Sequence, residues 1–296
     1  MIAAQQQPLP LFQSVEAEDL RYPPVQVPRG AVPSLVKWTG GKRSQAARIA
    51  SLAPPHARYF EPFLGGGAVL FFMARPGSVV GDDYGPLVAL WRQVAEDPGM
   101  VAQEYRQSWN DLQADLPGYY YKARERFNRC PNPADLNFLL RTCVNGIVRF
   151  NDAGEFNNSF HLSRRGMQPD RFQEIVERWH ERLRAVDIRQ GDFEETISEA
   201  KEGDFVYLDP PYVGTQQRYM TGPEPARLMT ALFRLNDRGV RWALSYDGQR
   251  GETQYEQVVP EGLFRRRIAL ASGLSAVGKV LNSSIEGVEE ALYLNY

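Results

Sequence analysis

The sequence predicts an α/β fold, in which one twisted sheet is interrupted by an inserted, mainly helical domain that carries a β-hairpin. Residues 31–93 and 191–296 alternate short apolar strand patterns with helical patterns. Residues 94–190 between them differ in composition, because they are rich in Arg, Asn and aromatic side chains. Residues 1–30 combine a run of three glutamines with several prolines and are predicted to form a flexible N-terminal segment.

Composition and charge narrow the function classes. The chain has 296 residues, of which 43% are hydrophobic and 24% are charged, as in an ordinary globular protein. No stretch is long and apolar enough to span a bilayer, so no membrane partner is expected. Cys130, Cys143 and three scattered histidines predict neither a disulfide framework nor a metal site. The formal net charge is −2, so nucleic-acid binding would depend on local basic stretches such as 121–171 and Arg265–Arg267.

The first elements predict a βαβ unit with glycines in its first turn. Tyr59–Phe63 is a short apolar strand, Gly65–Gly67 forms the turn, Ala68–Ala74 is helical, and Ser78–Gly81 is a second strand that ends at Asp82. Glycines let the backbone approach a ligand, and an acid after the second strand can accept hydrogen bonds from ribose hydroxyls. This geometry suits an adenosine-bearing cofactor, although the spacing is not the G-x-G-x-x-G dinucleotide fingerprint.

The later elements follow the same rules. In the middle region, Leu136–Val144 is predicted to be a helix that Asn145-Gly146 ends, and Asn151–Gly154 to be a hairpin or loop between aromatic flanks. Arg171–Arg184 is a further amphipathic helix. Beyond residue 191, the predicted helix is Leu228–Leu235. The predicted strands are Phe205–Leu208, Val240–Ser245 and Glu290–Leu294.

The strand Phe205–Leu208 runs directly into Asp209-Pro210-Pro211-Tyr212, which carries the most specific chemistry. Ligands of open α/β sheets bind at such strand ends. The prolines hold the chain rigid and remove two backbone donors, which leaves a carboxylate, carbonyl groups and an aromatic ring. A carboxylate and a carbonyl can accept the hydrogens of a base amine while the ring stacks on the base. Two such acceptors return the amine lone pair for in-line attack on a sulfonium methyl group.

From Val36 to Tyr296 the sequence resembles the Dam-type DNA adenine methylases. Four stretches carry the resemblance, namely Lys37–Lys42 (KWTGGK), Glu61–Gly67 (EPFLGGG), Gly191–Phe193 (GDF) and Asp209–Tyr212 (DPPY). The resemblance implies a Rossmann-like methyltransferase sheet, with a catalytic domain formed by residues 31–93 and 191–296. Residues 94–190 would then be the domain that recognises the DNA target.

The resemblance also implies S-adenosylmethionine as the cofactor. Trp38 and Lys42 would help to bind it, Asp82 would bind its ribose, and Asp192 would bind its adenine amine with Phe193 packed nearby. The implied cofactor-binding residues are Lys37, Trp38, Lys42, Phe63, Gly65, Gly67, Asp82, Asp192, Phe193 and Asp209. The implied catalytic residues are Asp209 and Pro210, which accept hydrogen bonds from the target amine, and Tyr212, which stacks on the flipped adenine.

The stretch Arg149–Asn157 resembles the family's DNA-contacting hairpin. An aromatic residue at the tip of such a hairpin can wedge into the base stack, while Arg and Asn contact base edges or phosphates. We therefore predict Phe150 as the wedge. The predicted DNA contacts are Arg149, Phe150, Asn151, Asn157, Arg164 and Arg165. The expected partner is double-stranded DNA, and the expected location of this bacterial or phage-type protein is the cytoplasm. Whether it also has a cognate restriction endonuclease stays open.

The sequence predicts a site-specific adenine-N6 methyltransferase, with GATC as the leading recognition site. Ala153 and Ser159 depart from the pattern of GATC-reading members, which have a basic residue and a proline there. The alternative within the class is an N4-cytosine methyltransferase, and methylation of RNA or of a protein amide is a further variant. A nicotinamide-dependent oxidoreductase is the alternative from another class, but it leaves the Asp209–Tyr212 tetrapeptide without a role. A third alternative is a DNA-binding module that has lost catalysis. Such a module would be expected to carry a broken motif, whereas all the expected catalytic residues are present here.

Overall fold

The structure is a computed structural model. It describes residues 32–163, 165–211, 223–250, 253–255, 259–272 and 288–296. The predicted flexible segment 1–30 and the predicted site residues Arg164 and Tyr212 lie outside the described residues.

The described strands build one sheet in the order β3–β2–β1–β4–β5–β8–β7, and β6 pairs with β5 beside this path. The strands are β1 Tyr59–Glu61, β2 Val79–Asp82, β3 Asp187–Gln190, β4 Phe205–Leu208, β5 Arg241–Arg250, β6 Thr253–Tyr255, β7 Arg266–Ser272 and β8 Val288–Leu294. The first five strands along the path are parallel, whereas β8 and β7 run antiparallel to their neighbours. The order 3-2-1-4-5 is that of a doubly wound nucleotide-binding sheet.

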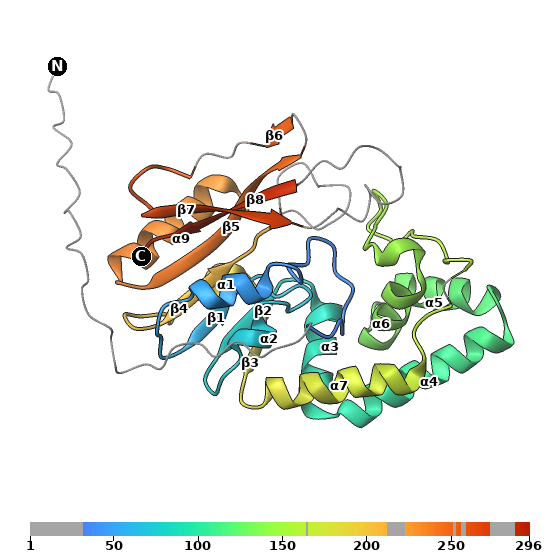
Figure 1. Ribbon diagram of the computed structural model, residues 1–296. Helices are drawn as coiled ribbons and strands as arrows, with labels where there is room; N and C mark the ends of the chain where they lie inside the picture. Colours follow the sequence, from blue (N-terminus) through green and yellow to red (C-terminus); the bar gives the residue numbers. More distant parts are fainter. Residues whose placement is uncertain (1–31, 164, 212–222, 251–252, 256–258, 273–287) are drawn as a thin grey trace, which may run out of the picture.

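The helices cover both faces of the sheet and form a separate group at one side. They are α1 Ala46–Leu52, α2 Leu70–Met73, α3 Gly85–Glu96, α4 Pro98–Ala114, α5 Gly118–Arg129, α6 Pro133–Thr142, the 3₁₀ turn η1 Val144–Gly146, α7 Pro169–Leu183, α8 Phe193–Thr196 and α9 Pro225–Asp237. Figure 1 shows α5 and α6 on the right, beyond α3, and α4 and α7 side by side along the bottom of the view, while most strands lie to the left.

The central strand β4 explains why the sheet is covered on both faces. All four of its residues are buried, and side chains of successive strand residues point to opposite faces. Phe205 and Tyr207 pack into the core that includes α1, α2 and α7, whereas Val206 and Leu208 pack with residues of α8 and α9. A strand that is buried on both faces reads as a continuous apolar run, as Phe205–Leu208 does.

The structure confirms the α/β class and most predicted elements, with shifted ends. The first strand ends at Glu61 because Pro62 has no backbone N–H to donate to a neighbouring strand. Helix α6 begins earlier than predicted, because the Asn132 side chain accepts a hydrogen bond from the Asp135 N–H and caps the helix. Its continuation to Val144 is wrong, because α6 stops at Thr142 and the turn η1 contains Asn145 at φ 57°.

The sheet extends further into the middle region than the sequence indicates. Strand β3 falls within residues 94–190, which we assigned to the inserted domain, yet it pairs with β2 from Asp187 to Gln190. The helices α4 to α7 precede it in the chain. The last residues of that stretch therefore belong to the sheet, while the division into a catalytic and a recognition domain stays a prediction.

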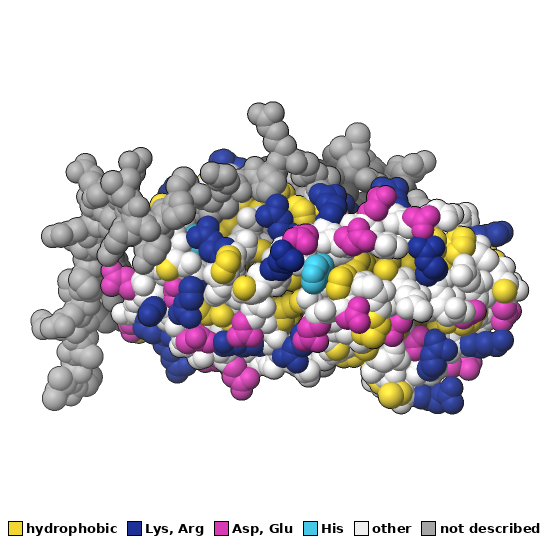
Figure 2. All heavy atoms as spheres, turned by 90° about the horizontal axis from the view of Figure 1, so that it is seen from below, with side chains coloured by type: hydrophobic (Ala, Val, Ile, Leu, Met, Phe, Trp, Pro, Cys, Tyr) yellow, Lys and Arg dark blue, Asp and Glu magenta, His cyan; other side chains and the backbone are white. Residues whose placement is uncertain are grey.

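The surface seen from below carries charges of both signs. Figure 2 shows Lys and Arg side chains interspersed with Asp and Glu side chains over this face, which includes α4 and α7. Such mixing is typical of a solvated face. Among the described residues, no helix is both long and apolar enough to cross a membrane. Over the same part of the chain, no cluster of His, Cys, Asp or Glu side chains could hold a metal ion.

Candidate active site

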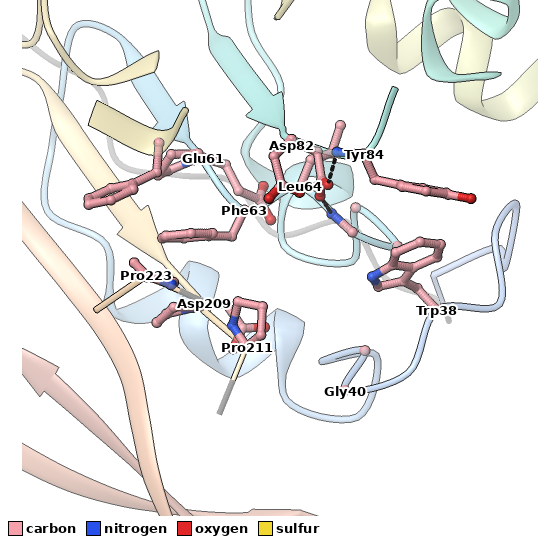
Figure 3. A pocket seen from close by; sticks show the side chains of 18 of the residues that line it. Trp38, Gly40, Glu61, Phe63, Leu64, Asp82, Tyr84, Asp209, Pro211 and Pro223 are labelled. Carbon is pink, nitrogen blue, oxygen red and sulfur yellow. Dashed lines mark hydrogen bonds between the residues drawn. The ribbon is translucent and has the colours of Figure 1, made fainter. Parts of the chain in front are cut away.

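The segments that follow β1, β2, β3 and β4 meet around one cavity of about 570 Å³. Because these strands are parallel, their carboxyl ends lie at the same edge of the sheet, where ligands of such folds bind. A further wall comes from Trp38–Lys42, which precedes α1. Figure 3 shows Asp209 and Pro211 on one side of the cavity, with Asp82 and Trp38 on other sides.

The glycine turn after β1 is shaped by an aromatic side chain. Gly65 has φ +46°, and a Cβ built there would lie 2.9 Å from Cδ1 of Trp38. Gly67 has φ +65°, and a Cβ there would lie 3.0 Å from two ring carbons of Trp91. Side chains at these two positions would be strained by φ and obstructed by the tryptophans. The turn therefore requires glycine, and Trp38 packs directly on its backbone.

Asp82, at the end of β2, fixes the same turn. Its carboxylate accepts hydrogen bonds from the N–H of Gly65 at 2.9 Å and of Tyr84 at 3.1 Å. Figure 3 draws both bonds beside the ring of Tyr84. Burial raises the pKa of Asp82 above its ordinary range, while these two N–H groups lower it and the neighbouring Asp83 raises it. Asp82 therefore holds the glycine turn and also lines the cavity.

Asp192 and Phe193 follow β3 and are held by Arg227 of α9. Asp192 caps α8 by accepting a hydrogen bond from the Glu194 N–H at 2.8 Å. The Arg227 guanidinium donates to both Asp192 oxygens, at 2.6 and 2.9 Å, and lies 5.0 Å from the centre of the Phe193 ring. Phe193 in turn stacks on Phe63 at 5.3 Å. Partial burial raises the pKa of Asp192, but the hydrogen bonds from Arg227 and Glu194 outweigh it and lower the pKa overall.

Arg227 was not predicted from the sequence, and its position suggests a measurable contribution to cofactor binding. We expect Arg227→Ala to weaken the affinity for S-adenosylmethionine about fivefold, because Asp192 and Phe193 lose the group that orients them. Isothermal titration calorimetry measures this affinity. The matched control is Arg234→Ala, since Arg234 also pairs with Glu194 but does not line the cavity. Equal affinities of the Arg227 variant and the wild type would remove Arg227 from the site.

Asp209 follows β4 and forms a buried ion pair with Lys42. The Lys42 ammonium lies 2.8 Å from Oδ1 of Asp209 and 3.5 Å from Oε2 of Glu290 in β8. Burial raises the pKa of Asp209 to about 6, Lys42 lowers it, and the charge of Glu290 raises it. Lys42 was predicted to contact the cofactor, and it does line the cavity, but its ion pair is with the predicted catalytic acid.

Glu61, the last residue of β1, is a further acid in the cavity wall. It belongs to the EPFLGGG stretch but was not predicted as a site residue. It is 3% exposed and accepts a hydrogen bond from the Tyr59 hydroxyl at 2.8 Å. Burial raises the pKa of Glu61 to about 8, with the nearby charge of Asp209 acting in the same direction. A neutral carboxyl in the cavity wall is therefore expected at neutral pH.

The raised pKa of Glu61 predicts a pH-dependent stability. Its pKa is higher in the folded protein than in the unfolded chain, so the unfolded chain loses its proton first as pH rises from about 4.5 towards 8. Ionisation of the unfolded chain then disfavours folding. We expect the melting temperature of Glu61→Gln, relative to wild type, to rise by about 3 °C or more between pH 5 and pH 8. A constant difference, as expected for the exposed control Glu202→Gln, would contradict the raised pKa.

Most predicted cofactor residues line the cavity together. They are Trp38, Lys42, Phe63, Gly65, Gly67, Asp82, Asp192, Phe193 and Asp209, joined by the predicted catalytic Pro210. Lys37 does not line it, because its side chain packs against Gly146 instead. Phe150, predicted as a DNA wedge, does line it. Arg227 and Glu290 were missed because nothing local in the sequence links them to Asp192 and Lys42.

The predicted DNA-contacting hairpin is a tight turn, and Phe150 lies at its base rather than at its tip. Phe150 forms an antiparallel bridge with Phe156 and touches the rings of Phe156 and Tyr84 edge-on. The Asn151 side chain accepts hydrogen bonds from the N–H groups of Ala153 and Glu155, at 3.1 and 2.9 Å, and so shapes the turn. Packing on two rings, which the sequence does not reveal, moves Phe150 away from the tip.

The remaining predicted DNA contacts differ in exposure. Arg149 and Arg165 are exposed, and Asn157 is half-buried and donates its backbone N–H to the Arg149 carbonyl at 3.0 Å. The hairpin is anchored to α5 by Asn128, whose side chain exchanges two hydrogen bonds with the Phe156 backbone, at 2.8 and 3.1 Å. Neither element alone indicates this contact, which fixes the hairpin relative to the helices.

The strand order and the cavity at the strand ends define a Rossmann-like fold with a ligand site at one edge of its sheet. The chain belongs to the family of D12 class N6 adenine-specific DNA methyltransferases, which it matches over residues 38–257. Family membership removes the nicotinamide-dependent oxidoreductase as an alternative.

Named relatives come from several sources. The type II methyltransferase M1.LlaDCHI of Lactococcus lactis subsp. cremoris is 32% identical over 185 residues, which cover 60% of this chain and 64% of that protein. M.MjaIII, a type II methyltransferase of Methanocaldococcus jannaschii, is 32% identical over 203 residues, or 61% of this chain and 69% of the relative. The DNA adenine methylase of Haemophilus influenzae is 28% identical over 187 residues, or 62% and 64%. The chain thus spans about two thirds of the length of these relatives.

Proposed function

We propose that this protein is a site-specific DNA adenine-N6 methyltransferase that acts on an adenine flipped out of duplex DNA. The single observation that carries the proposal is the shared cavity. The glycine turn at Gly65, the acid Asp82 and the Asp209-Pro210-Pro211 segment all line it. Family membership assigns adenine as the target base and so favours it over cytosine.

The cavity fits S-adenosylmethionine by the chemistry of its walls. Asp82 supplies a carboxylate for ribose hydroxyls beside the glycine turn, and Asp192 supplies one that can accept from an adenine amine. The stacked rings of Phe63 and Phe193 offer an aromatic surface for a flat base. When bound, the cofactor supplies a methyl group on a positively charged sulfur. The carboxylates of the wall suit this positive charge.

The segment after β4 is suited to hold the target amine. Asp209 lines the cavity through a carboxylate whose Oδ1 is held by Lys42. Pro210 contributes a carbonyl but no N–H donor, so the segment presents acceptors to an amine. Two acceptors localise the lone pair on the amine nitrogen, which makes it a better nucleophile. We propose Tyr212 as the ring that stacks on the base, and it lies outside the described residues.

DNA contacts are proposed for the hairpin and the segment after it. Arg149 and Arg165 are exposed and can reach phosphates. The Asn151 side chain would have to exchange its turn contacts for base contacts, whereas Asn157 holds the turn through its backbone N–H. Phe150 remains our candidate for the wedge, which requires it to leave the rings of Tyr84 and Phe156 when DNA binds. GATC is the proposed site. Ala153 departs from the pattern of GATC-reading members, because its methyl side chain cannot form the bidentate contact to guanine that an arginine forms.

One experiment tests base, position and recognition site together. Unmethylated DNA is treated with the purified protein and S-adenosylmethionine and then sequenced with detection of modified bases. We expect N6-methyladenine within one short motif, and none in DNA treated with the Asp209→Asn variant. N4-methylcytosine in place of N6-methyladenine, or no modification at any motif, would each refute the proposal.

A further inference from the structure

The buried ammonium group of Lys42 is shared by two carboxylates. Its Nζ lies 2.8 Å from Oδ1 of Asp209 and 3.5 Å from Oε2 of Glu290, and it donates to the Gly40 carbonyl at 3.3 Å. Lys42 is 4% exposed, and the two acids are 19% and 18% exposed. A buried cluster with two negative charges and one positive charge carries a net charge of −1 when both acids are ionised.

The sheet itself brings these three groups together. Asp209 follows β4, whereas Glu290 lies in β8, on the far side of β5 in the strand order. Strand β5 is parallel to β4 and antiparallel to β8, so the first residues of β8 lie at the same edge of the sheet as the carboxyl end of β4. Lys42 reaches both acids from the turn before α1. The arrangement therefore depends on the antiparallel strand at the C-terminal end of the chain.

Glu290 and Lys42 act on Asp209 in opposite directions. An ammonium that paired with Asp209 alone would make that carboxylate a weaker hydrogen-bond acceptor. The positive charge stabilises the ionised carboxylate and so lowers the pKa of Asp209. Glu290 draws on the same ammonium and adds a negative charge, and the pKa of Asp209 is raised by it accordingly. Other titratable groups that act on Asp209 or respond to its charge are Glu61 of β1, Tyr59 of β1 and Tyr207 of β4.

We propose that Glu290 is a positioning residue that competes for the Lys42 ammonium and so keeps Asp209 a strong hydrogen-bond acceptor for the target amine. The inference rests on the proposed function, because it assigns Asp209 the role of acceptor. Asp209 is oriented by Lys42 and made more basic by Glu290. Within the described part of the chain Glu290 does not line the cavity, and it acts on the site through these two groups.

The test measures the pKa of Asp209 directly and the pH profile of kcat beside it. Protein labelled with ¹³C at the aspartate carboxyl is titrated by NMR, and the Asp209 signal is assigned by its loss in Asp209→Asn. We expect Glu290→Gln to lower the Asp209 pKa by about half a unit or more, and Lys42→Met to raise it. The acid limb of kcat should move in the same directions. At its plateau, kcat of Glu290→Gln should fall about threefold to tenfold, with the Kd for S-adenosylmethionine unchanged.

Controls separate this role from a structural one. Glu261→Gln removes an exposed acid and should change neither the Asp209 pKa nor kcat, while Glu290→Asp should restore part of both. If Lys42→Met does not fold, Lys42→Gln replaces it. An unchanged Asp209 pKa in Glu290→Gln overturns the proposal, even if kcat falls. If the wild type transfers no methyl group, the proposed function fails, but the NMR titration still decides whether Glu290 tunes Asp209.

Discussion

Asp209→Asn is expected to lower kcat for methyl transfer by about 1000-fold or more while changing the Kd for S-adenosylmethionine by no more than about threefold. Asparagine keeps the size of the side chain and one acceptor oxygen, but it loses the negative charge and can no longer take up a proton. The acceptor oxygen that remains is neutral and weaker, so it localises the lone pair of a base amine less well. Because Lys42 also contacts Glu290 at 3.5 Å, its ammonium keeps a negative partner and the variant should remain folded.

Single-turnover transfer of a labelled methyl group to DNA measures the first effect, and calorimetry with S-adenosylmethionine measures the second. The matched control is Asp237→Asn, because Asp237 is an exposed acid at the end of α9 that does not line the cavity. Melting curves of the two variants show whether both are folded. A kcat within tenfold of the wild type would exclude Asp209 as the acceptor for the target amine. Another group of the cavity would then have to fill that role.

The parts of the site that the sequence predicts well are those encoded within a few residues. A buried strand followed by Asp209-Pro210-Pro211 already specifies where the carboxylate lies, because parallel strands end at one edge of the sheet. The glycine run at Gly65–Gly67 predicts its turn in the same way, and Gly65 and Gly67 have the positive φ values that favour glycine, +46° and +65°. Local patterns of this kind do not depend on distant packing.

The parts that the sequence misses arise from contacts between distant segments. Arg227 orients Asp192 from a helix 35 residues further along the chain, and an arginine in a helix ordinarily indicates a solvated face. Glu290 reaches Lys42 only because β8 inserts between β5 and β7. Phe150 lies at the base of the hairpin, where it is half-buried against the rings of Tyr84 and Phe156. Each of these depends on tertiary packing, which periodicity and spacing do not encode.

Asp82 is placed by a local strand pattern and also makes a long-range contact. Its removal should have the largest effect on cofactor binding. Its carboxylate is placed by the strand pattern of β2, but it also holds the glycine turn after β1 through the Gly65 N–H at 2.9 Å. Asp82→Ala would leave that N–H and the Tyr84 N–H without their acceptor and would remove the acceptor proposed for the ribose. The turn would then lose the shape that brings its backbone close to a ligand.

We expect Asp82→Ala to weaken the Kd for S-adenosylmethionine about 100-fold, equivalent to about 3 kcal/mol, and Asp82→Asn to weaken it less because one acceptor oxygen remains. Because burial raises the pKa of Asp82, the wild-type affinity should fall as pH is lowered and the carboxylate takes up a proton. Asp82→Ala should lose this part of the pH dependence. Calorimetry at several pH values measures both effects. A Kd within threefold of the wild type would mean that the glycine turn and Asp82 are not the cofactor site.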